Sequence, residues 1–257
     1  MSLSTQPMQA ASDPLQRFRQ GASEDLLSLA VLHSKELERG LVQQLLEASF
    51  PAGMSIALGS DAGKEAVRLT RQGLVDLPGE LDLDTMQILA TEYADIYLNY
   101  NFRASPCESV WLDEDHLTMQ EPMFRIRKVY ERHGLAAQDW RQRPDDHLVH
   151  QLQFLSHLMG PQAPEDHLRE AARFMDEHIL LWIDDFSERV AQRAATRFYA
   201  GLALLTAAYL DELRDLLAQV LDEPRPSAAE TQEPQQSSDA VAVQPPAPYV
   251  PGSAPSW

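Results

Sequence analysis

The segment TRFYAGLALLTAAYLDELRDLLAQVL, residues 196–221, sets the fold class of this chain of 257 residues. Its large apolar residues recur every three or four positions, the spacing that puts side chains on one face of an α-helix. They are Phe198, Leu202, Leu205, Tyr209, Leu213 and Leu217. Residues 165–223 contain no proline and a single glycine, Gly201, so nothing in this region forces a helix to end. The segment therefore predicts a long amphipathic helix.

The segments that precede it show similar spacing. We expect further helices over residues 24–49, 61–75, 84–101, 121–133 and 145–159, with two more within 165–195. Ser23 is the expected N-cap of the first helix, and Pro144 and Gly160 flank the fifth, as start and stop residues do. No segment alternates apolar and polar residues in the way a half-buried β-strand does. The sequence thus predicts an all-α fold, a single globular domain of seven or eight helices.

Proline placement predicts the limits of this domain. Of the 17 prolines, eight lie between Pro224 and Pro255, in a stretch without hydrophobic periodicity. Such a composition favours a disordered or extended chain. We therefore expect a flexible N-terminus over 1–22, the helical domain over 23–222 and a disordered proline-rich tail over 223–257. The long connector 102–120 we expect to be ordered, because it carries an apolar pair, Val110 and Trp111, to bury.

The charge balance excludes some partners and favours others. Acidic residues outnumber basic ones by 39 to 21, which gives a net charge of −18. This argues against binding nucleic acid or an anionic membrane surface, and fits a cationic partner. The single cysteine, Cys107, excludes an internal disulfide, a thiolate zinc site or an iron–sulfur cluster built by this chain alone. No apolar run has the length of a signal peptide or a membrane span, so we expect a cytoplasmic protein.

No motif predicts catalysis. The stretch 59–65 resembles a phosphate-binding loop, but its spacing is one residue short and no strand precedes it. Three Asp–His pairs occur, at 115–116, 146–147 and 166–167. Adjacent helical residues diverge by about 100°, so neither residue of a pair is placed to share a metal with the other. We therefore expect no catalytic residue, no metal and no cofactor. A helical metal-dependent enzyme that uses these pairs, and an adaptor that acts through its proline-rich tail, are the alternatives.

Several motifs follow one another in a characteristic order. They are PCESVWLD at 106–113, Tyr130-x-x-x-Gly134, PDDHL at 144–148, Gln151-Leu152-x-Phe154-Leu155, His178-x-x-Leu-Trp182-x-x-x-Phe186, and Phe198-Tyr199-x-x-Leu202. In this order the set resembles the TorD/DmsD family of cytoplasmic chaperones for molybdenum enzymes, over roughly residues 24–220. The first and third motifs are the specific ones. Arg143 departs from the family, which often has Glu before this proline.

The resemblance implies a non-enzymatic helical protein. Family members bind the twin-arginine leader of a molybdopterin-dependent enzyme of the DMSO reductase class and assist cofactor insertion before export. The implied partner is the catalytic subunit of such an enzyme, with no nucleic acid and no stable membrane insertion, and the family includes both monomers and homodimers. By position, the implied leader-binding residues are Tyr97, Pro106, Ser109, Trp111, Pro144, Asp146 and His147. We add Glu108 and Asp145, because the arginines of a leader need carboxylates.

Overall fold

The computed structural model describes residues 13–78, 81–138 and 140–226. The chain divides into two units, Met1–Arg225 and Pro226–Trp257, and the helices belong to the first. The expected proline-rich tail lies outside the described residues from residue 227 onwards. None of the described helices is long and apolar enough to cross a membrane.

Within these residues the structure has ten α-helices and no β-strand, which confirms the all-α prediction. The helices are α1 (Pro14–Ser34), α2 (Arg39–Glu47), α3 (Asp61–Val75), α4 (Leu83–Tyr97), α5 (Ser109–Leu112), α6 (Glu121–Arg132), α7 (Leu148–Met159), α8 (Asp166–Glu177), α9 (Ile183–Arg193) and α10 (Arg197–Leu221). A short 3-10 helix, η1 (Ile179–Leu181), links α8 to α9. We expected seven or eight helices; the larger number arises because the expected helix 24–49 is interrupted and the connector contains α5.

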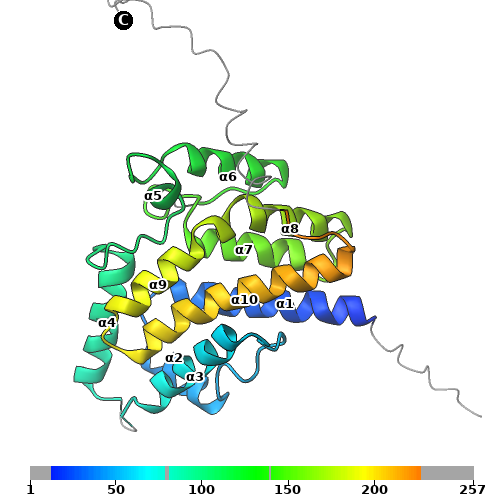
Figure 1. Ribbon diagram of the computed structural model, residues 1–257. Helices are drawn as coiled ribbons and strands as arrows, with labels where there is room; N and C mark the ends of the chain where they lie inside the picture. Colours follow the sequence, from blue (N-terminus) through cyan, green and yellow to red (C-terminus); the bar gives the residue numbers. More distant parts are fainter. Residues whose placement is uncertain (1–12, 79–80, 139, 227–257) are drawn as a thin grey trace, which may run out of the picture. The chain divides into compact units, whose positions relative to one another are not determined.

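The long helix α10 organises the first unit. It packs against α3, α8 and α9, while α1 packs against α7 (Figure 1). In Figure 1, α10 runs through the middle of this unit, with α7 and α8 on one side and α2 and α3 on the other. All six apolar residues of its predicted face are buried. Burying such a face is the main source of stability for a helix in a globular protein.

The first helix begins earlier than expected. Asp13 caps α1 by accepting a hydrogen bond from the amide of Leu15, at 3.1 Å, and Pro14 is the first helical residue. Residues 14–22, which we expected to be flexible, are therefore helical in the structure. Arg19 is buried there, and its guanidinium donates hydrogen bonds to the carbonyls of Leu158, Met159 and Pro164. Ser23 is not the N-cap that we expected; its hydroxyl bonds to Ser156 on α7.

The helices α3 and α10 approach each other closely at a glycine. A Cβ atom built on Gly201 would lie 2.4 Å from the backbone nitrogen of Thr70, a contact that real Cβ atoms do not make. The missing side chain thus lets the two backbones come together at the centre of the fold. A Cβ atom built on Gly73 of α3 would likewise clash with the backbone of Phe198 on α10.

We predict that Gly201→Ala lowers the free energy of unfolding by about 1–3 kcal/mol, because the added methyl group pushes α3 away from α10. The matched control is Gly40→Ala on α2, where nothing lies within 4 Å of the new Cβ. There stability stays the same or rises by up to about 1 kcal/mol, since alanine is the better helix former. Urea denaturation followed by circular dichroism measures both. Equal stability of the two variants would contradict the packing argument.

Candidate functional site

Two of the predicted motifs lie side by side in the interior. Residues 105–109 run antiparallel to the residues that lead into α7, with a β-bridge between Cys107 and His147. The amide of Glu108 donates to the carbonyl of Asp146 at 3.2 Å, and the amide of Leu148 donates to the carbonyl of Pro106 at 2.7 Å. We call the two segments, 105–109 and 144–151, the clasp. The clasp fastens the connector between α4 and α6 to the start of α7.

Asp146 stands at the centre of the clasp. Its Oδ2 accepts hydrogen bonds from the amide of Ser109 at 2.8 Å and from the hydroxyl of the same serine at 2.6 Å. The side chain is completely buried, and its Oδ1 has no hydrogen-bond partner among the described residues. Burial raises the pKa of the Asp146 carboxyl to about 6, although the bonds from Ser109 favour the charged form. This carboxylate therefore holds the connector and is closed to solvent.

The other two acids of the clasp also have partners inside the chain. Glu108 is fully buried; its Oε1 lies 2.9 Å from Nδ1 of His178, and its Oε2 accepts from the amide group of Gln151 at 3.2 Å. Asp145 forms an ion pair with Arg127 of α6, at 2.8 Å. Removing one partner of such a pair would leave a buried charge unpaired, which is strongly destabilising.

His147 is the N-cap of α7. Its Nδ1 accepts a hydrogen bond from the amide of Val149 at 3.1 Å, so the helix begins at Leu148 rather than at Asp145 as expected. Burial is the largest cause that lowers the pKa of His147 well below its ordinary value, and Arg143 lowers it further. The imidazole is therefore neutral in the folded protein at neutral pH.

Trp111 lies at the border of the clasp, whereas Tyr97 lies on α4. Trp111 is partly exposed; its indole nitrogen donates to the carbonyl of Ser105 at 2.8 Å, and the guanidinium of Arg189 lies 4.5 Å from its ring centroid. The connector is thus packed at this point, as we expected. Tyr97 is buried on α4, where its hydroxyl contacts Nδ1 of His33. The structure therefore brings the predicted residues of both motifs together, but leaves only Trp111 of the nine partly open to solvent.

Sequence reasoning missed three partners of these residues as members of the site. Gln151 and His178 belong to quoted motifs, but Asp146 precedes the first residue of α7, so no helical spacing links Gln151 to it. Arg127 lies on α6 and has no motif of its own. Its contact with Asp145 is decided by how α6 packs against the clasp, and no local pattern announces it.

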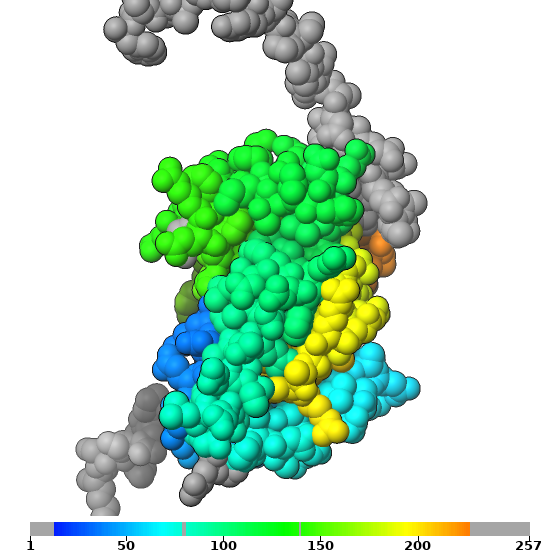
Figure 2. All heavy atoms as spheres, turned by 90° about the vertical axis from the view of Figure 1, so that its left-hand side faces the viewer, coloured from blue at the N-terminus to red at the C-terminus, as the bar shows by residue number. Residues whose placement is uncertain are grey.

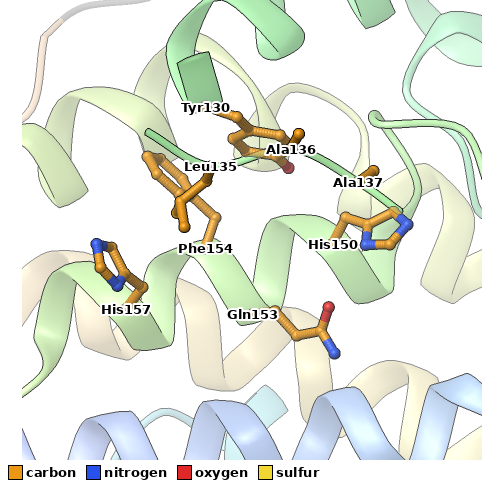
Figure 3. Close-up of a pocket in the computed structure, with 8 residues that line it drawn as sticks. All are labelled: Tyr130, Leu135, Ala136, Ala137, His150, Gln153, Phe154 and His157. Carbon is orange, nitrogen blue, oxygen red and sulfur yellow. The ribbon is translucent and has the colours of Figure 1, made fainter. Parts of the chain in front are cut away.

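Hollows open on the surface near these elements. One, of about 230 Å³, lies between α7 and the residues that follow α6 (Figure 3). Its lining includes the rings of Tyr130 and Phe154 and, at opposite ends in Figure 3, His150 and His157. A second, of about 490 Å³, lies along α4 and is lined by the carboxylates of Asp84, Glu92 and Asp95 and by the apolar Ile88 and Phe102. A third, about 450 Å³ and mostly apolar, lies between α1 and α2.

The chain belongs to the nitrate reductase delta subunit family, whose model matches residues 60–188. Chaperone protein TorD of Vibrio cholerae is 28% identical over 148 residues, which are 54% of this chain and 67% of that protein. The Vibrio vulnificus protein of the same name is 27% identical over 205 residues, 76% of this chain and 94% of the relative.

A third relative is the probable Tat proofreading chaperone DmsD of Haemophilus influenzae. It is 26% identical over 127 residues, which are 49% of this chain and 60% of the relative. These findings confirm the resemblance to the TorD/DmsD chaperones. The three relatives are named as chaperones and none of them as an enzyme, in agreement with the prediction that this chain is not an enzyme.

We predict that Asp146→Asn changes how stability depends on pH. The pKa of Asp146 is about 6 in the folded protein, above its ordinary value of 3.8, so the protonated carboxyl favours folding. This contribution is complete below pH 4 and is lost as the pH rises through 6, a change of about 3 kcal/mol. The neutral amide lacks it. From pH 4 to pH 7, the variant should therefore gain up to about 3 kcal/mol relative to the wild type in urea denaturation. A difference between the two proteins that stays constant with pH would contradict this account.

Proposed function

We propose that this chain is a system-specific chaperone for a molybdopterin-dependent enzyme of the DMSO reductase class. In this proposal it binds the twin-arginine leader of the catalytic subunit and assists cofactor insertion before export. The observation that carries the proposal is its membership of a family whose relatives are named chaperones, one of them a Tat proofreading chaperone. Because such a leader is read before export, the proposed role places the chain in the cytoplasm.

The chemistry of a twin-arginine leader suggests where it docks. Two guanidinium groups are followed by an apolar segment, so the receptor needs exposed carboxylates next to apolar side chains. The hollow along α4 offers this combination, with Asp84 and Asp95 beside Ile88 and Phe102. Ile88 is 56% exposed, so its side chain is open to contact with the apolar part of a leader.

The same hollow borders the connector that the clasp holds. Asp95 accepts a hydrogen bond from Asn101 at 2.6 Å, and Arg193 of α9 donates to the carbonyl of Phe102. In Figure 2 the elements α4 and α9, in teal and yellow, share one face with the connector. We propose that the leader lies along this face and reaches Trp111. The buried motif residues would then position the connector, and the exposed carboxylates would meet the arginines.

The clasp supports neither alternative from the sequence. The side chains of Asp146 and His147 are buried, and both form hydrogen bonds within the clasp or its flanking residues. The tail that an adaptor would use lies outside the described residues from residue 227.

The net charge of −18 favours encounter with a cationic leader in either oligomeric state, monomer or homodimer.

We predict that this chain binds a leader with two arginines more tightly than the same leader with two lysines. Affinity purification of the full chain from its native cells, with mass spectrometry, identifies the client, and a synthetic leader of that client is then titrated calorimetrically. Replacing both arginines of the peptide by lysines should weaken binding at least about tenfold, because lysine cannot pair bidentately with a carboxylate.

Asp84→Asn should weaken the same binding by about tenfold, the value of one charge-assisted hydrogen bond of about 1.5 kcal/mol. Asp61→Asn is the matched control, since Asp61 is also an exposed acid in the first turn of a helix but lies on α3. Its affinity should stay near that of the wild type. Equal loss in both variants would mean that only net charge matters, and equal affinity for both peptides would overturn the proposed recognition.

A further inference from the structure

Three histidines from three different helix ends meet on the surface of the first unit. His133 follows the last residue of α6, His157 lies in the last turn of α7, and His167 lies in the first turn of α8. One ring nitrogen of each lies within 4.8 Å of the others. His133 and His167 are partly exposed and His157 is exposed, so the cluster can be reached from solvent.

Separate features of the fold bring the three rings together. His133 ends α6, and Gly134, which follows it, has a φ of +67° that glycine adopts without strain. The short turn through Gly160 brings His167 back beside His157. The ring centroids of His133 and His167 are 5.1 Å apart, and Phe154 packs edge-on against His133 at 5.2 Å.

We infer that His133, His157 and His167 form a binding site for a divalent metal ion of the kind that prefers imidazole, with Zn²⁺ as the leading candidate. Zinc takes three histidines at about 2.0–2.1 Å, with a fourth position for water or another ligand. Neighbouring ligand nitrogens in such a tetrahedral site are about 3.3 Å apart. Small rotations of partly exposed rings close the difference from 4.8 Å.

Two features around the cluster favour a metal over ordinary packing of rings. The Nδ1 of His167 is buried without a hydrogen-bond partner among the described residues, an arrangement that is costly unless something binds it. In addition, a carboxylate oxygen of Glu170 lies 3.7 Å from Nε2 of His133. Carboxylates commonly accompany metal-bound histidines, where they orient the ring or complete the coordination. The salt bridges of Glu170 with Arg132 and Arg173 keep this carboxylate in position.

A metal here would tie α6, α7 and α8 together beside the hollow of Figure 3, whose lining includes His157. The bound state would be more stable than the free protein, because an ion that binds only the folded chain shifts the equilibrium towards it. This inference does not depend on leader binding, and the residues involved are distinct from Asp84 and from the clasp.

The test uses the full chain without a histidine tag. Equilibrium dialysis against Zn²⁺ in excess Mg²⁺, followed by elemental analysis, gives the number of ions bound. Titration with Co²⁺ gives the visible absorption of a tetrahedral site as a second, spectroscopic readout. The variants His133→Asn, His157→Asn and His167→Asn each remove one ligand, and circular dichroism checks their folding. His157→Asn changes the exposed member, so it is the variant least able to disturb the fold.

His116→Asn is the matched control, because His116 is an exposed histidine of the connector outside the cluster, and asparagine tolerates its φ of 54°. We expect one zinc ion per chain in the wild type and in this control, and a melting temperature raised by several degrees with Zn²⁺. Each cluster variant should bind at least tenfold more weakly and lose the cobalt spectrum. The inference is overturned if the wild type binds no stoichiometric metal, or if His157→Asn, correctly folded, binds as tightly as the control.

Discussion

The hydrogen bonds from Ser109 to the buried carboxylate of Asp146 join segments that are 37 residues apart. Next to them, a β-bridge joins Cys107 to His147, and the carboxylate of Glu108 forms hydrogen bonds with Gln151 and His178. The connector between α4 and α6 is thereby attached to the start of α7. Because these groups are buried, the loss of one would leave others unsatisfied, at about 1–3 kcal/mol each. The position of the exposed part of the connector depends on this small polar core.

The many acids of this chain serve two physical purposes. Inside, Glu108 and Asp145 face His178 and Arg127, because a buried charge without a partner is unstable. A cationic ligand would have to displace these partners to reach them. Outside, carboxylates such as Asp84 remain hydrated and attract positive charge over a distance.

Local signals predicted elements well where the ends of a helix are marked by its own residues. Ser60 caps α3 through the amide of Gly63, and the helix spans 61–75 as expected. The first helix was harder, because residues 14–22 carry only two large apolar side chains, Leu15 and Phe18, and the burial of Arg19 depends on carbonyls contributed by residues 158–164. The residues of the candidate site differ in the same way in how far the sequence predicted them. Asp146 and Ser109 were found from their motifs, whereas Arg127 was not, because its role depends on packing.

The sequence by itself determined the all-α class, the acidic character and the order of motifs that marks the family. These follow from spacing and composition, which act within one segment of chain or over the chain as a whole. Only the tertiary structure decided that the motif acids lie inside, with partners from the chain itself, and that His133, His157 and His167 converge. Of the three Asp–His pairs, only the last contributes to that cluster, with His167. The physical reason is that helical periodicity assigns a residue to a face, whereas the packing of separate helices decides which faces meet.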